Sequence, residues 1–152
     1  MKKVLITLDY NPDSEKVVNM GYELSKLMNA EICLFHVLSE VRYYGMQYEP
    51  FMGYEGYAFP VDYRIQEEFV KVAQDYLEKT KQHLNNGNNI STHLAEGDTA
   101  KTILEYAEEW KADLIVMGTH SHGTLEKIFL GTVASSVLEH TKIPVYMVPT
   151  GK

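Results

Sequence analysis

The stretch Asp113-Leu114-Ile115-Val116-Met117-Gly118-Thr119-His120-Ser121-His122-Gly123, followed by Gly131-Thr132-Val133, decides the fold class of this chain. An apolar run ends at Met117, and Gly131-Thr132 opens a segment with the pattern of a helix. A turn of small residues after a strand can direct backbone N–H groups into one concavity, and the helix N-terminus beside it adds further donors. The pattern therefore predicts a phosphate cradle, in which glycine permits close approach of the anion or a positive φ.

The composition is that of an ordinary soluble globular chain. The 152 residues suffice to bury a core, with 45% hydrophobic and 23% charged residues. The net charge of −7 argues against a nucleic-acid or anionic membrane surface, because such surfaces need a basic stripe. Cys33 lies in an apolar run and is the only cysteine, so a buried thiol is expected rather than a disulfide.

The N-terminal apolar stretch is interrupted at Asp9, too early for a signal peptide. No run approaches the roughly 18 apolar residues that a membrane span requires. These observations predict a cytoplasmic protein.

Strands and helices are expected to alternate along the whole chain. Apolar runs of strand length indicate strands at residues 4–8, 31–37, 90–95, 114–117 and 145–148. Helices are expected to begin at Asp13-Ser14, near Tyr63, after the cap Asp98, and at Thr132, the last running to about His140. The apolar positions of the first three are Val17, Gly21, Leu24 and Met28; Ile65, Phe69, Val72, Tyr76 and Leu84; and Ala100, Ile103, Leu104, Ala107 and Trp110. Residues 85–89 have the composition of a turn.

This order predicts an α/β fold, a Rossmann-like open sandwich in which a five-stranded parallel sheet carries helices on both faces. In such sheets, ligands bind beyond the carboxyl ends of the strands, where the strand order reverses. Residues 8–10, 36–37 and 117–123 are expected to meet at that edge. Without an internal repeat or a linker, residues 1–152 are expected to form a single domain.

These residues resemble the universal stress protein family over essentially the whole chain. The resemblance rests on the strand ending in Asp9, on His36-Val37, on residues 113–118, and on Ile143-Pro144-Val145. The nucleotide-binding branch of the family carries Gly, two residues, Gly, nine residues, Gly, and then Ser or Thr. The spacing is kept here by Gly118, Ser121, Gly131 and Thr132. Ser121 replaces the second glycine, which leaves nucleotide affinity open, and Gly123 could restore the flexibility of the loop.

The resemblance implies that ATP binds with Mg²⁺ or Mn²⁺ at this edge. Adenine would lie near Val37 and Met117, the ribose near Asp9, and the triphosphate against residues 118–123 and the helix start at Thr132. The implied nucleotide-binding residues are Thr7, Leu8, Asp9, Val37, Met117, Gly118, His120, Ser121, Gly123, Gly131, Thr132 and Val133.

Several of these residues also have a plainer interpretation. Asp9 could cap the next turn instead of approaching a ribose or a metal, and Val37 could be an ordinary core residue. Thr132 could cap its own helix, which is compatible with phosphate binding. His120 and His122 have no third ligand at recognisable spacing, so no metal site of their own is expected and they line the loop or face water.

The segment at about 38–62 is rich in tyrosine and interrupted by glycine. Loops of this length are often functional, and the aromatic content is unusual for a solvated linker. The segment could be a lid or a partner surface, or an insertion that packs partly on its own domain.

No nucleophile elbow, Walker lysine loop or His-Glu metal helix is present, and no catalytic residue is predicted. The leading hypothesis is therefore a stress-response or regulatory protein that binds ATP with little or no turnover. The alternatives are a nucleotide-free universal stress protein that acts through protein contacts with an unknown partner, and a slow ATP hydrolase. The uncharged strand at 144–148 should lie at a sheet edge and pair two copies into a homodimer, with Val133, Val137 and Leu138 extending the patch.

Overall fold

The computed structural model describes residues 1–9, 12–39, 63–84, 89–119 and 130–150. The elements are β1 (Lys3–Leu8), α1 (Ser14–Leu27), β2 (Glu31–Leu38), α3 (Tyr63–His83), β3 (Ile90–Glu96), α4 (Thr99–Glu109), β4 (Leu114–Gly118), α5 (Thr132–His140) and β5 (Val145–Val148). Every predicted strand and helix is confirmed. β1 begins one residue earlier than predicted, and β2, β3 and β4 each end one residue later than predicted.

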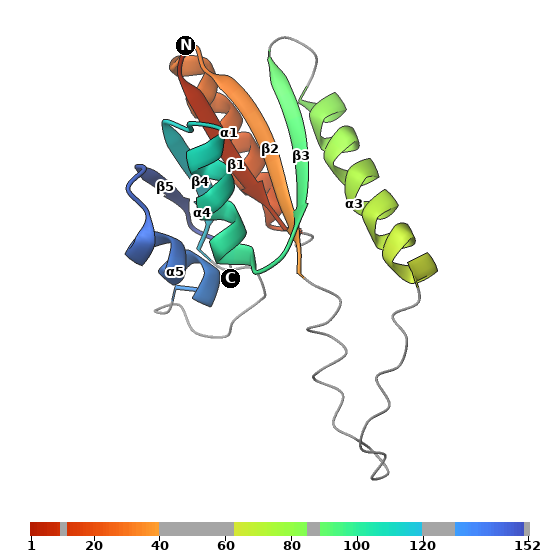
Figure 1. Ribbon diagram of the computed structural model, residues 1–152. Helices are drawn as coiled ribbons and strands as arrows, with labels where there is room; N and C mark the ends of the chain where they lie inside the picture. The colour runs from red at the N-terminus through yellow and green to blue at the C-terminus, as the bar shows by residue number, and fades with distance from the viewer. Residues whose placement is uncertain (10–11, 40–62, 85–88, 120–129, 151–152) are drawn as a thin grey trace.

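The five strands form one sheet in the order β3-β2-β1-β4-β5, and every neighbouring pair is parallel. The chain adds β2 and β3 on one side of β1, and β4 and β5 on the other. The strand order therefore reverses between β1 and β4. Helices α1 and α3 cover one face of the sheet, and α4 and α5 cover the other (Figure 1). The predicted Rossmann-like α/β architecture is confirmed.

Each face of the sheet has its own core, because successive side chains of a strand point to opposite faces. In β1, Leu5 packs under α4 and α5 with Phe35 and Ile103. Its neighbours Val4 and Ile6 pack under α1 and α3. Cys33 is fully buried, as predicted, and burial raises the pKa of its thiol.

The predicted apolar face of α3 is partly wrong. Phe69 is 53% exposed and Val72 is 58% exposed, whereas the helix packs on the sheet through Ala73, Leu77 and the following Leu84. Val72 directly precedes Ala73, and one residue turns an α-helix by about 100°, so its side chain leaves the packed face. The small Ala73 gave no strong apolar signal, although it lies at the centre of that face.

The other helices agree better with the sequence pattern. In α1, Val17 and Gly21 are buried while Leu24 and Met28 are half-buried. In α4 the inward positions are as predicted, and the Asp98 side chain accepts a hydrogen bond from Lys101 N at 3.0 Å. Asp13 occupies the N-cap position of α1, but its side chain makes no capping bond.

The predicted patch beside β5 also needs a correction. Val137 is completely buried in the core under α5, so it cannot contribute to a surface between two copies. Leu138 is exposed and Val133 is half-buried. None of the helices in the described ranges combines the length and the apolar character needed to cross a membrane.

Candidate functional site

The described strand ends converge at the carboxyl edge of the sheet, as predicted. β1 and β4 are neighbours where the strand order reverses, and Leu8 at the end of β1 lies opposite His36 of β2. β2 continues to Leu38 because its backbone still pairs with β3 there, and Gly97 N donates to Leu38 O at 3.0 Å. This edge therefore combines the ends of three adjacent strands at the position where open α/β sheets bind ligands.

The start of α5 is joined directly to the end of β4. Gly131 N donates to Thr119 O at 2.8 Å, and Thr119 N donates to Val148 O at 3.0 Å. Gly131 is the N-cap of α5, and its carbonyl accepts from Ser135 N at 2.9 Å. The N–H groups in the first turn of a helix have no partner within the helix, and the helix dipole makes that end positive. The junction therefore has the properties of an anion-binding site.

Gly118 and Gly131 at this junction differ in their surroundings. A Cβ on Gly118 would lie 3.1 Å from Thr150 Cγ2 and 3.2 Å from Val17 Cγ2, so a side chain here would require these neighbours to shift. Gly131 has φ −58°, which any residue adopts. Within the described residues, the left-handed glycine is Gly97, with φ 144°. The expected positive φ is therefore wrong for Gly118 and Gly131.

The chain after β5 closes this region from the side of α1. Thr150 N donates to Thr119 Oγ1 at 3.0 Å, and the two threonine hydroxyls are 3.3 Å apart. Lys16 Nζ of α1 donates to Pro149 O at 2.7 Å. Thr119 therefore hydrogen-bonds both the end of β5 and the N-cap of α5. The sequence pattern did not indicate this role.

The predicted nucleotide-binding residues lie on both faces of the sheet. Val37 and Met117 belong to the core under α4 and α5, Val133 packs against it, and Thr7 follows Leu5 on that face. Thr7 Oγ1 donates to Val116 O at 3.3 Å. Leu8 belongs instead to the core under α1 and α3, so its side chain lies on the opposite face of the sheet from Val37 and Met117.

Val37 is 7% exposed and Met117 is 3% exposed. Their side chains therefore behave first as core residues, in agreement with the plainer interpretation of Val37. Thr132, by contrast, is exposed at the first residue of α5. His120, Ser121, His122 and Gly123 lie outside the described residues, as do the turn at 85–88 and the Tyr-rich segment from residue 40 to residue 62.

Asp9 is held by side chains that the sequence did not connect with it. The Ser14 hydroxyl donates to Asp9 O at 2.7 Å and also hydrogen-bonds the Asp9 carboxylate, while Asp9 N donates to Ser14 Oγ at 3.2 Å. The Tyr76 hydroxyl donates to Asp9 O at 3.1 Å. The N-cap of α1 is Asp13, so Asp9 does not cap that helix.

His36 is buried beside this group. Its Nδ1 lies 2.6 Å from Leu8 O, so the neutral imidazole donates to the carbonyl that precedes Asp9. Burial lowers the pKa of His36, and the hydrogen bond to Leu8 and the nearby charge of Asp9 oppose this shift. Sequence reasoning marked His36 only as the end of a strand.

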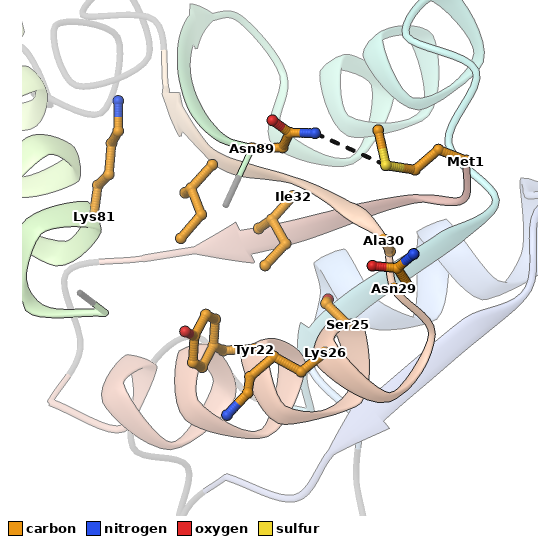
Figure 2. A pocket seen from close by; sticks show the side chains of 10 residues that line it. Met1, Tyr22, Ser25, Lys26, Asn29, Ala30, Ile32, Lys81 and Asn89 are labelled. Carbon is orange, nitrogen blue, oxygen red and sulfur yellow. Dashed lines mark hydrogen bonds between the residues drawn. The ribbon is translucent and has the colours of Figure 1, made fainter. Parts of the chain in front are cut away.

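A separate cavity of about 710 Å³ lies at the amino edge of the sheet, between the ends of α1 and α3 (Figure 2). Its lining includes Tyr22, Lys26, Asn29, Ala30, Ile32, Lys81 and Asn89. The ammonium of Lys26 lies 5.2 Å from the centre of the Tyr22 ring. None of the predicted site residues lines this cavity. Within the described ranges, no three His, Cys, Asp or Glu side chains are grouped to hold a metal ion.

The parallel sheet, with the start of α5 hydrogen-bonded to the end of β4 at the point of strand reversal, defines a Rossmann-like α/β protein. The universal stress protein family model matches residues 1–149, and the chain belongs to this family. It is 33% identical to the universal stress protein MJ0531 of Methanocaldococcus jannaschii, over 99% of this chain and 84% of that protein.

Solved structures show the same fold. The hypothetical protein MJ0577 superimposes with a TM-score of 0.79 at 22% identity, covering 99% of this chain and 97% of that chain. A universal stress protein in complex with cAMP superimposes with a TM-score of 0.69 at 17% identity, covering 97% of this chain and 96% of that chain.

Proposed function

We propose that this universal stress protein binds ATP, with Mg²⁺ or Mn²⁺, at the carboxyl edge of the sheet and acts in a stress response or in regulation with little or no turnover. The observation that carries the proposal is the hydrogen bond between Gly131 N and Thr119 O, at 2.8 Å. It holds the positive end of α5 beside the end of β4, where the strand order reverses. That combination favours the phosphates of a nucleotide.

The resemblance to the nucleotide-binding branch of the family implies where the other parts of the nucleotide would lie. The triphosphate would lie against the first turn of α5 at Thr132, and the adenine on the α4–α5 side of the sheet near Val37 and Met117. The ribose would lie near Asp9, whose carboxylate would also offer an oxygen ligand to a phosphate-bound Mg²⁺. The cAMP complex supports this class of ligand, since cAMP is an adenine nucleotide bound by a protein of the same fold.

Calorimetry with ATP and Mg²⁺, supported by thermal unfolding, tests the proposal directly. We expect saturable heat and a higher unfolding temperature at millimolar nucleotide. The absence of both would overturn ATP binding. The sharper variant is Gly131→Val, because a branched side chain would intrude on the phosphates while the extended backbone at this position suits valine. If Gly131→Val folds and binds as well as wild type, the placement of the phosphates is wrong.

The second candidate is a universal stress protein that works without nucleotide through protein contacts. The exposed Phe69 and Val72 on α3 favour it, because they offer apolar surface to a partner. Mass spectrometry of the denatured purified protein separates the candidates, since stoichiometric ATP or AMP would count against the second. A slow ATP hydrolase is the third candidate, and a rate unchanged by Asp9→Ala would argue against it.

We also propose that two copies pair through the strand at 144–148. β5 is the last strand of the sheet order, and Tyr146 is 37% exposed on it. Pairing this edge with a second copy would satisfy its backbone groups. Sedimentation should show a dimer for wild type at micromolar concentration and a monomer for Tyr146→Lys. A monomeric wild type would refute the dimer. The single domain over residues 1–152 and the cytoplasmic location stay predictions.

A further inference from the structure

The end of β1 is fixed by side chains from three other elements. The Leu8 carbonyl accepts from His36 of β2, and the Asp9 carbonyl accepts from Ser14 of α1 and from Tyr76 of α3. Tyr76 is 67 residues away from Asp9 along the chain, and its hydroxyl reaches the Asp9 carbonyl at 3.1 Å. All of these contacts come from the α1–α3 side of the sheet, opposite the core that contains Val37 and Met117.

These contacts are costly to lose, because the groups that make them are shielded from water. Ser14 and His36 are buried, and Tyr76 is half-buried. Burial raises the pKa of the Tyr76 phenol, with a smaller contribution of the same sign from Asp9, while a hydrogen bond with Ser14 opposes the shift. The phenol therefore stays protonated at neutral pH and remains a hydrogen-bond donor.

Asp9 lies just beyond the last residue of β1, and the pairing of β1 with β2 ends at Leu8. The sheet therefore does not by itself fix the direction of the Asp9 carboxylate. Ser14 hydrogen-bonds both the backbone and the carboxylate of Asp9, and Tyr76 secures the carbonyl on the same residue. Removal of the Tyr76 hydroxyl would take away one of the two donors to the Asp9 carbonyl, and so loosen the backbone from which the carboxylate projects.

We propose that Tyr76, through its hydrogen bond to the Asp9 carbonyl, is a positioning residue that holds the Asp9 carboxylate for recognition of the ribose hydroxyls. This inference rests on the proposed function and adds a specificity to it. A site built to accept hydrogen bonds from a hydroxyl discriminates against a ligand that lacks the hydroxyl. The protein should therefore prefer ribonucleotides to deoxynucleotides, and Tyr76 should be needed for that preference.

The test compares Tyr76→Phe, which removes only the hydroxyl, with wild type by calorimetry against ATP, 2′-deoxy-ATP and 3′-deoxy-ATP with Mg²⁺. Tyr22→Phe is the matched control, because Tyr22 is also half-buried on this side of the sheet but lines the cavity at the opposite edge. Wild type should bind ATP more tightly than at least one deoxynucleotide. Tyr76→Phe should weaken ATP binding about three- to tenfold, the net effect of one hydrogen bond. It should weaken the deoxynucleotides less, so that the preference shrinks.

A purely structural role for the Tyr76 hydroxyl would weaken all three nucleotides equally and leave the preference intact, which would overturn the inference. Unchanged ATP affinity in Tyr76→Phe would overturn it as well, and so would equal losses in Tyr22→Phe. Those outcomes leave ATP binding by wild type in place. A wild type that binds none of the nucleotides would overturn the proposed function, and this inference with it. Ser14→Ala provides a second variant, for which the same loss of preference is expected.

Discussion

The two edges of the sheet differ in shape and in electrostatics, and the difference decides where an anion would bind. The amino edge has the cavity of about 710 Å³, but it is formed where α1 and α3 end. The carboxyl edge is tightly packed around Gly118, and α1, α4 and α5 begin there. Helices that connect parallel strands run against the strand direction, so their positive N-termini gather at the carboxyl edge.

The lysines at the amino edge do not reverse this assignment. Lys26 and Lys81 lie in the last turns of α1 and α3, where positive side chains complement the negative ends of the helix dipoles. Lys26 also pairs with Glu23 at 3.5 Å. Their charge is therefore explained by the helices that carry them. The comparison teaches that the direction of the chain, more than the volume of a cavity, favours the carboxyl edge for the proposed anion site.

The largest expected effect tests the contrast in packing. Gly118→Val should destabilise the protein by about 2 kcal/mol or more, because the added side chain meets Thr150 and Val17 at van der Waals contact or closer. Ala30→Val at the amino edge adds a similar volume beside the cavity and should change stability by less than about 0.5 kcal/mol. Urea denaturation measures both. Equal costs would show that the carboxyl edge is no more tightly packed than the amino edge.

The second prediction tests the contrast in electrostatics. Thr132→Glu places a negative charge at the first residue of α5, where it should repel the phosphates and weaken ATP binding by about tenfold. Gln82→Glu introduces the same charge in the last turn of α3, at the amino edge, and should leave the affinity unchanged. Calorimetry at low salt measures the two affinities. A larger loss of ATP affinity in Gln82→Glu than in Thr132→Glu would indicate that the phosphates bind at the amino edge instead.

The smallest effect concerns pH. The pKa of His36 is lowered by burial, so the unfolded chain takes up the proton at a higher pH than the folded protein does. The stability that comes from neutral His36 is present above the unfolded pKa, near 6.5. It is lost progressively as the pH falls below that value.

Urea denaturation between pH 8 and pH 5 should show this loss in wild type and a flatter profile in His36→Gln, whatever its absolute stability. His83→Gln is the control, since His83 is an exposed side chain at the end of α3. It should keep the wild-type profile. A profile that His36→Gln leaves unchanged would mean that another group controls the pH dependence.

The sequence predicted the elements well where their signals are local. Strands buried on both faces are continuous apolar runs, and β1 and β4 matched to within a residue. Asp98 is the cap of α4, and Thr132 is the first residue of α5, as their residue types indicated. The prediction failed for the packed face of α3. Its apolar side chains lie on more than one side of the helix, and the sequence alone could not show which of them would contact the sheet.

The sequence by itself determined the fold class, the order of strands and helices, the family, and the place of the Gly131-Thr132 helix start after the fourth strand. Those properties follow from hydrophobic period, caps and spacing, which act over a few residues. Only the tertiary structure decided that Gly118 packs closely against Thr150, that Val137 lies in the core, and that Tyr76 reaches Asp9. The physical reason is that such contacts join residues far apart in the chain, so their chemistry exists only after the sheet has brought the elements together.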